Sequence, residues 1–350
     1  MKKKKKTRAT LPTMKLGVAD SFRRALLKAE ILKNRTFSEI RRPLRKRAIM
    51  QTRREEQAVA ERDTKSVIFV DSGSFRRDRR GNVLHDNWGD DLNLFFLKAI
   101  FGKKFVCGFD ARGKIAFPRE PHFQFIGSII GPAGDVSRTV WGSGIQHPEK
   151  LPRELGHRQK FLAVRGPLTR EKLRERGCEC PEIYGDPALL LPEFLNFVPP
   201  PKRERRGIGL ILQWRAERNF EALRFAQRIA RIGGRVIPTR GYRDWREFVR
   251  DVCACEFVVS ASLHGLILAE AYGIPNVWCG FSAEELGESH CFKYRDFYAS
   301  VGKAAMTPLR ISEKTTLREL ENAAANWLPG KIDTAPLLAA CPFPIVKGKI

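Results

Sequence analysis

The chain has 350 residues, of which 43% are hydrophobic. This is enough apolar sequence for two cores, because a single core stops growing at roughly 250–300 residues. No stretch approaches the ~18 uncharged apolar residues of a membrane span, and no apolar block follows the basic start as in a secretory signal. We therefore expect a cytoplasmic protein. The eight scattered cysteines fit a reducing compartment, and their C-x-C pairs lack the spacing of a zinc site, so no metal is predicted.

The net charge of +25 is concentrated near the N-terminus. Residues 1–65 hold 21 lysines and arginines against 7 acidic residues, a net +14, which leaves +11 for the other 285 residues. We expect no independent core in this extension, which is predicted to be partly disordered or helical. Such an arm can contact an anionic membrane surface or another polyanion, or remain solvated, and nucleic acid is the least expected partner.

The regular fold is predicted to begin with a buried strand at residues 66–70, an apolar run too short for a helix. A helical pattern follows at 92–100, with Asp90 as its predicted N-cap. A second helix lies between Pro167 and Gly177, because proline favours the start of a helix and glycine its end. Other short apolar runs lie at 123–130, 139–141, 161–164 and 183–191.

A linker is predicted at 192–206, which contains three consecutive prolines and a charge run. Beyond it, predicted strands (207–212, 236–237, 257–260, 276–278) alternate with predicted helices (219–232, 245–253, 263–272), and a final helix is predicted at 317–328. This alternation implies parallel sheets, which bind ligands at the carboxyl ends of their strands. We therefore predict an α/β fold. Its parts are a basic extension (1–65), an N-terminal lobe (66–195), a C-terminal lobe (205–330) and a tail (331–350), with a cleft between the lobes.

Several loops at predicted strand ends carry polar residues, although no dinucleotide fingerprint or Walker loop is present. In 87–91, Gly89 permits close backbone approach, and the following helix offers free N–H groups to an anion. Asp90 and Asp91 would instead accept bonds from sugar hydroxyls, although the residues alone favour an ordinary capped helix start. Arg165 follows a predicted strand and can pair with phosphate or carboxylate, or can be a plain surface arginine.

Two further residues follow predicted strands. Asp186 either caps a helix or bonds the backbone around Gly185, and the structural interpretation is favoured. His264 lies in the first turn of a predicted helix, directly after the strand at 257–260. The helix dipole disfavours an imidazolium there and a bound dianion would restore it, so His264 is a candidate proton donor beside an anionic substrate. A purely structural histidine is the alternative.

Five of these segments, taken together, resemble the polysaccharide pyruvyl transferase family. They are 87–93 (NWGDDLN), 140–145 (VWGSGI), 164–170 (VRGPLTR), 185–192 (GDPALLLP) and 262–265 (SLHG). The order and spacing of the segments carry the resemblance rather than any single one. It covers about 66–310 and leaves 1–65 outside.

The resemblance implies a fold of two Rossmann-like lobes similar to the B-type glycosyltransferases. It implies transfer of a pyruvyl unit from phosphoenolpyruvate, without another cofactor, to two hydroxyls of a sugar in a bacterial polysaccharide or its lipid-linked precursor. The product is a cyclic ketal. Carried over by position, His264 is the general acid and Arg165 an anion clamp, whereas Asn87, Gly89 and Asp90 line the cleft on the acceptor side.

One position departs from the family pattern. Many members have Arg-Leu-His where this chain has Ser262-Leu263-His264, and a serine supplies a hydrogen bond but no charge. Either another cation, such as Arg215, Arg240 or Lys293, replaces the arginine, or the donor binds differently.

Two other functions remain open from the sequence. The two-lobed fold also suits a B-type glycosyltransferase that uses a nucleotide sugar. The basic segment 1–65 also suits a polyanion-binding protein, although that function does not explain the polar loops at the strand ends.

Overall fold

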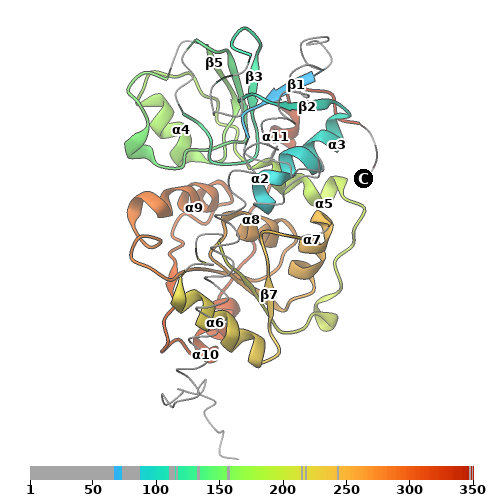
Figure 1. Cartoon of the computed structure of the whole chain (residues 1–350), viewed down its shortest axis with the longest axis vertical. Coiled ribbons are helices and arrows are strands. Elements are labelled where there is room, and N and C mark those ends of the chain that lie inside the picture. Colours follow the sequence, from blue (N-terminus) through green and yellow to red (C-terminus); the bar gives the residue numbers. More distant parts are fainter. Residues whose placement is uncertain are drawn as a thin grey trace, which may run out of the picture.

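The computed structural model describes residues 67–72, 87–109, 115, 117–131, 135–155, 158–213, 216, 219–242, 244–346, 348 and 350. They form two lobes, one above the other in Figure 1. The predicted extension 1–65 and the candidate cation Arg215 lie outside the described residues. Within these ranges, no helix is both long and apolar enough to cross a bilayer.

The N-terminal lobe is built on a parallel sheet in the order β2-β1-β3-β4-β5. Its strands are β1 (Val67–Val70), β2 (Lys104–Cys107), β3 (His122–Gln124), β4 (Arg138–Trp141) and β5 (Gln159–Ala163). Its helices are α2 (Trp88–Leu92), the π-turn η2 (Asn93–Leu97), α3 (Lys98–Phe101), α4 (Pro167–Arg174) and α5 (Leu191–Phe194), with 3-10 turns η3 (Pro148–Lys150) and η4 (Pro187–Leu190). The first three form one continuous helical stretch, and such π-turns often accompany functional sites.

The C-terminal lobe repeats this plan, with a parallel sheet in the order β10-β9-β8-β6-β7. Its strands are β6 (Ile208–Ile211), β7 (Arg235–Ile237), β8 (Phe257–Ser260), β9 (Asn276–Gly280) and β10 (Leu309–Arg310). Its helices are α6 (Phe220–Arg231), α7 (Trp245–Cys253), α8 (Leu263–Ala271), α9 (Glu288–Ser300) and α10 (Leu317–Ala325), and the turn η5 (Lys202–Glu204) precedes β6.

Counted from the first strand of each lobe, both sheets have the doubly wound order 2-1-3-4-5. The chain switches direction between β1 and β3 in one lobe and between β6 and β8 in the other, and ligands bind at such switch points in this class of fold. Strands such as β6 and β8 are buried at every residue, as expected when helices cover both faces of a parallel sheet. The prediction of an α/β fold with two Rossmann-like lobes is therefore confirmed.

A continuous apolar core joins the lobes. Trp88 of α2 stacks on Phe248 of α7, with 4.3 Å between ring centroids, and its Nε1 donates to the carbonyl of Trp245 at 2.8 Å. Helix α8 is buried at every residue from Leu263 to Glu270, because it packs against its own sheet and against the N-terminal lobe. The residues that follow β8 are thus held firmly against the other lobe.

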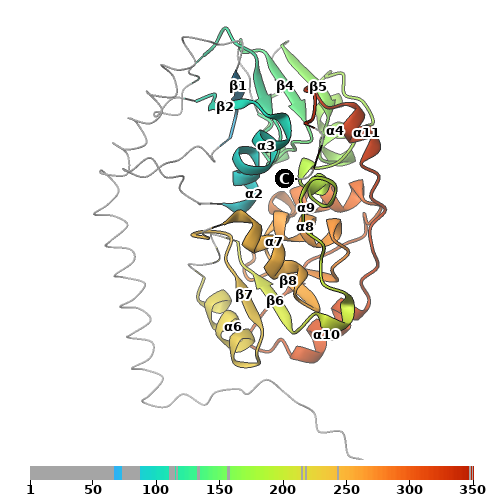
Figure 2. The ribbon, with the colours of Figure 1, turned by 90° about the vertical axis from the view of Figure 1, so that its right-hand side faces the viewer.

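The segment predicted as a tail returns to the N-terminal lobe. Figure 2 shows it rising from α10 to α11 (Ala335–Ala339) in the N-terminal lobe. Leu337 of α11 is fully buried, and its carbonyl accepts from Trp141 Nε1 at 2.8 Å. Farther on, the backbone N–H of Val346 donates to the carbonyl of Ile100 at 2.7 Å. The last residues of the chain therefore complete the packing of its first sheet.

The predicted N-cap of the first helix was wrong. Helix α2 begins at Trp88 with Asn87 in the N-cap position, and Asp90 is its third residue. Asn87 is still extended, and the helical backbone begins at Trp88, which is buried against Phe248 of the other lobe. The sequence analysis also did not predict α9, whose buried residues mix apolar side chains with the polar His290, Lys293 and Asp296.

Candidate active site

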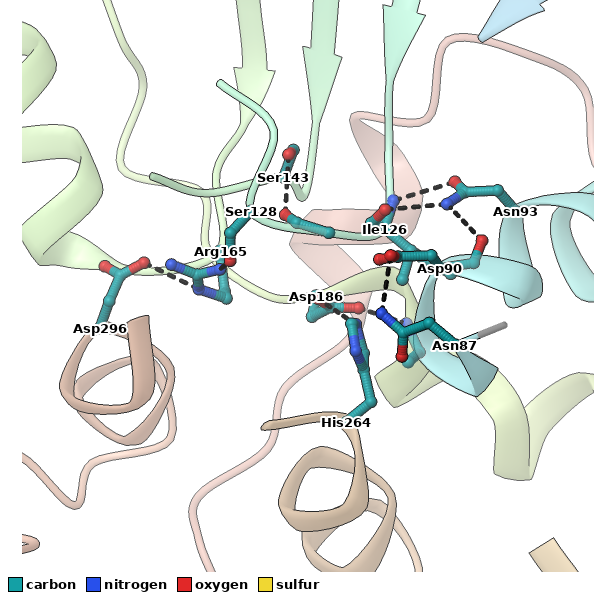
Figure 3. A network of polar contacts seen from close by, with 12 residues as sticks. Asn87, Asp90, Asn93, Ile126, Ser128, Ser143, Arg165, Asp186, His264 and Asp296 are labelled. Carbon is teal, nitrogen blue, oxygen red and sulfur yellow. Dashed lines mark hydrogen bonds and ion pairs between the residues drawn. The ribbon is translucent and has the colours of Figure 1, made fainter. Parts of the chain in front are cut away.

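The polar loops of the two lobes meet around His264, the second residue of α8 (Figure 3). This position confirms that His264 begins a helix directly after β8, at the switch point of the C-terminal sheet. The N-terminal lobe faces it with the start of α2 and with the segment before η4. The structure thus brings together Asn87, Gly89 and Asp90 from one lobe with His264 from the other.

Gly89 lies against the imidazole of His264. A Cβ atom added at Gly89 would fall 1.8 Å from His264 Nδ1 and 2.1 Å from its Cγ. Only a residue without a side chain leaves room for the ring, which is 8% exposed. The glycine predicted to permit close backbone approach therefore admits a side chain of the other lobe.

Asp186 approaches the same imidazole from the N-terminal lobe. It is the N-cap of η4, and its Oδ1 accepts from the Ala188 N–H at 3.0 Å, which is the favoured structural role. Its second oxygen, Oδ2, lies 3.6 Å from His264 Nε2. Both atoms are buried, and neither has a hydrogen-bond partner among the described residues. Their separation exceeds hydrogen-bond length, so the pair is close but not bonded.

Asp90 is the other carboxyl near His264. Asn87 Nδ2 donates to Asp90 Oδ2 at 2.7 Å, and Asp90 remains partly exposed. The protein atoms packed around this carboxyl raise its pKa, an effect that His264, Asn87 and Lys293 oppose and Asp186 reinforces. A carboxyl with a raised pKa is better matched to exchanging a proton near neutral pH.

Lys293 reaches this group from α9 and is only 6% exposed. Its Nζ lies 5.2 Å from the centroid of the Tyr294 ring, and its charge acts on Asp90. Arg240 lies half-buried between β7 and α7. Ser262 occupies the N-cap position of α8 without capping it, and Ser260 Oγ accepts from the Ser262 N–H at 3.1 Å. The charge of Lys293 thus acts on Asp90, a carboxyl near His264.

Arg165 is fully buried and bridges the lobes. Its Nε donates to Asp296 Oδ2 of α9 at 3.0 Å, Nη2 donates to the Ile145 carbonyl at 3.0 Å, and Nη1 donates to Ser128 Oγ. Asp296 also accepts from the Thr169 N–H at 2.8 Å and from its hydroxyl at 2.7 Å. Figure 3 shows this cluster to one side of His264. The clamp role of Arg165 stays a prediction, since an anion would compete here with Asp296.

Two residues that the sequence analysis did not single out support these loops. Asn93 is fully buried; its Nδ2 donates to the Ile126 carbonyl at 2.8 Å and its Oδ1 accepts from the Ile126 N–H at 3.1 Å. Asn93 lies inside 87–93, one of the segments that resemble the family, and that resemblance could have pointed to it. Asp296 had no such signal, because α9 was not predicted.

The predicted cleft also stays a prediction. Around His264 the described residues of both lobes are in direct contact, as the Gly89 packing shows. An open depression of about 760 Å³ lies elsewhere, at the outer edge of the N-terminal lobe, between β5, α4 and residues 177–181. Its lining includes none of the candidate residues.

The match to a family model settles the relationship of this chain to known proteins. The model of the polysaccharide pyruvyl transferases matches residues 18–282, about three quarters of the chain. The chain belongs to this family. The match reaches into the basic extension, which the resemblance over 66–310 had left outside.

Two curated relatives are similar over most of their length. The succinoglycan biosynthesis protein ExoV of Rhizobium meliloti (strain 1021) is 26% identical over 252 residues, which cover 69% of this chain and 70% of the relative. The uncharacterized protein L143 of Acanthamoeba polyphaga mimivirus is 26% identical over 219 residues, 62% of this chain and 71% of the relative. No solved structure is a significant match.

Proposed function

We propose that this pyruvyl transferase family member transfers the pyruvyl group of phosphoenolpyruvate to two hydroxyls of one sugar. The acceptor is a bacterial polysaccharide or its lipid-linked precursor, and the products are a cyclic ketal and phosphate. The observation that carries the proposal is the position of His264 at the lobe junction, beside Gly89 and Asp90. Family membership and the relationship to a succinoglycan biosynthesis protein support the same reaction class.

The reaction needs an acid, an anion site and a proton acceptor. Protonation of the methylene carbon makes C2 of phosphoenolpyruvate electrophilic, and a sugar hydroxyl oxygen bonds to it. The bond from C2 to the phosphate oxygen breaks, and the second hydroxyl closes the ketal. One hydroxyl proton replaces the proton given to the methylene carbon, and the other leaves with phosphate, so the step balances.

The interlobe residues suit these roles. His264 donates the proton to the methylene carbon and regains one from the first hydroxyl. Asp90, whose raised pKa favours proton exchange and whose carboxyl is held by Asn87, takes the second hydroxyl proton. Lys293 balances the donor's negative charge, and Ser262 adds a hydrogen bond where many family members have an arginine.

A phosphate-release assay tests the proposal. The full chain is incubated with phosphoenolpyruvate and a panel of acceptor glycans, and the glycans are then weighed by mass spectrometry. We expect phosphate release and a glycan mass increase equal to pyruvate minus one water. His264→Gln should lower kcat by about 10²–10⁴-fold, the usual contribution of a general acid. His147→Gln is the control, because His147 bonds Ser289 Oγ at 2.8 Å and has no role in the proposed mechanism.

Two outcomes would contradict this function. A folded protein that forms no product across a broad glycan panel would argue against pyruvyl transfer. Sugar transfer from a nucleotide sugar in a parallel reaction would support a B-type glycosyltransferase instead. Adding liposomes with anionic lipid tests separately whether residues 1–65 bring the enzyme to a membrane surface.

A further inference from the structure

The contact between Asp186 and His264 joins the two lobes with an unsatisfied pair of polar atoms. Asp186 Oδ2 and His264 Nε2 are both buried, 3.6 Å apart, without another partner among the described residues. Leaving a carboxylate oxygen and a ring nitrogen buried and unbonded is unfavourable, and such atoms are rare in native proteins. Two such atoms facing each other do not stabilise the fold, so a functional role is the better explanation of their placement.

We infer that Asp186 is a positioning residue that holds a proton on His264 Nε2 and leaves Nδ1 to act on the substrate. This inference rests on the proposed function, because it assigns the atom through which His264 donates its proton. Asp186 Oδ1 is held by the Ala188 N–H, so the direction of Oδ2 is set by the backbone of η4. On the other side, the ring lies against Gly89 with Nδ1 next to that glycine.

The geometry needs only a small adjustment. Shortening the separation by about 0.5 Å would bring the two atoms to the ~2.7–3.2 Å of a hydrogen bond. Catalytic hydrogen bonds are often long without substrate and tighten in the complex. The two atoms come from opposite lobes, so a small movement of the His264 ring or of η4 on substrate binding would form the bond. The proton donor would thus be completed only in the substrate complex.

The charges around His264 explain why a carboxylate is needed. The ring lies at the N-terminal end of α8, whose dipole disfavours a positive charge there. Lys293 from α9 adds a further positive charge near the group, whereas Asp90 from α2 opposes both. Asp186 supplies a second negative charge and, unlike Asp90, faces Nε2 directly. It can therefore stabilise the imidazolium that donates from Nδ1.

The proton transfers remain balanced with this assignment. His264 gives its Nδ1 proton to the methylene carbon and becomes a neutral ring that keeps Nε2–H on Asp186. The first sugar hydroxyl then returns a proton to Nδ1 as its oxygen bonds to C2. Asp186 remains ionised throughout and never exchanges the proton.

Two variants test the inference while preserving the cap. Asp186→Asn and Asp186→Ser each keep an oxygen that can accept from the Ala188 N–H but remove the carboxylate. Asp244→Asn is the matched control, because Asp244 caps α7 through the Arg246 N–H at 3.0 Å and is not part of the candidate site. Side-chain NMR follows the protonation of His264, whose signal is assigned by its loss in His264→Gln. The pH profile of kcat is measured in parallel.

We expect both Asp186 variants to shift the pH of half-protonation of His264 downward by about one unit, and Asp244→Asn to leave it unchanged. Because the protonated ring is the acid, the falling limb of kcat should move to lower pH by a similar amount. Near neutral pH, kcat should fall by about 10–100-fold with little change in the KM for phosphoenolpyruvate.

The possible results separate the two proposals. An unchanged His264 titration in both folded variants would overturn the role of Asp186, even if the wild type is an active transferase. A shifted titration in a protein that transfers no pyruvyl group would keep the Asp186–His264 pair and reject the proposed reaction. A shifted titration with unchanged kcat would show that the pair is structural and would also overturn the inference.

Discussion

Two of the side-chain pairs at the lobe interface, Arg165–Asp296 and Asp186–His264, differ in how well they are satisfied. Arg165 and Asp296 are both fully buried, 3.0 Å apart. Arg165 also donates to Ser128 and Ile145, and Asp296 accepts from Thr169, which completes the cluster. Asp186 and His264 are also buried but remain 3.6 Å apart and unbonded. A satisfied network fixes one arrangement, whereas an unsatisfied pair keeps its atoms available. We therefore expect the first pair to hold the lobes together, and we propose the second pair for chemistry.

The largest expected effect comes from breaking the satisfied pair. Asp296→Asn leaves the buried guanidinium of Arg165 without its counter-charge, and should lower the free energy of unfolding by about 3–5 kcal/mol. Urea denaturation measures the change. The double variant Arg165→Met with Asp296→Leu should regain part of the loss, because it removes both buried charges. A loss below about 1 kcal/mol for Asp296→Asn would contradict the holding role of this pair.

Gly89→Ala should come next, because it forces the His264 ring away from its position. The new methyl group would fall 1.8 Å from Nδ1, so the ring or the lobe must shift. Overpacking of this kind costs about 1–3 kcal/mol of stability, and a displacement of about 1 Å in a catalytic group can lower kcat by about 10²-fold. Gly131→Ala is the control, since an added Cβ there meets no atom within 4 Å. Equal activity in the two variants would argue against the packing of His264 on Gly89.

Asp186→Asn should have a much smaller effect on stability than the same substitution at Asp296. The asparagine keeps the cap on Ala188, and the substitution removes a buried charge that has no hydrogen bond on Oδ2. We expect the free energy of unfolding to stay within about 1 kcal/mol of the wild type. Thermal and urea unfolding of the two asparagine variants, measured side by side, compare the pairs directly. Similar losses in both would remove the distinction between them.

The smallest effect is a pH dependence caused by Asp90. Its pKa is raised above the ordinary value of 3.8 in the folded protein, so its contribution to stability is complete below that value. The contribution is lost as pH rises through the raised pKa, because the folded state resists ionisation more than the unfolded state. Relative to Asp90→Asn, the wild type should therefore lose stability between pH 3.8 and neutrality. Unfolding curves for both proteins at several pH values test the sign, and a wild type that gains stability would reverse it.

The sequence predicted much of the fold because its signals are local. Short apolar runs bounded by turn residues indicated β1, β6 and β8, and the alternation with helices indicated parallel sheets. The beginning of α8 was predicted correctly, and with it the place of His264 after a strand. Other elements were missed, among them β2, β10, α9 and α11. The last of these lies in the predicted tail, whose packing partners are more than a hundred residues away in the chain.

The candidate site was predicted in its residue types but not in its pairings. His264, Gly89 and Asp90 were each identified from a loop at a strand end, and the structure brings all three together. The sequence analysis did not predict the pairing of Arg165 with Asp296, because the two residues lie 131 positions apart and α9 was not predicted.

The sequence by itself determined two α/β lobes, their strand ends and a histidine at the start of a buried helix, because these follow from residue patterns within a few turns of the chain. Only the tertiary structure decided which ionisable groups face each other. Side chains from separate lobes meet according to how the shared core packs, and no local pattern records the separation of Asp186 Oδ2 and His264 Nε2. The Arg165–Asp296 and Asp186–His264 contacts are therefore properties of the lobe interface, and the chemistry we propose depends on the second of them.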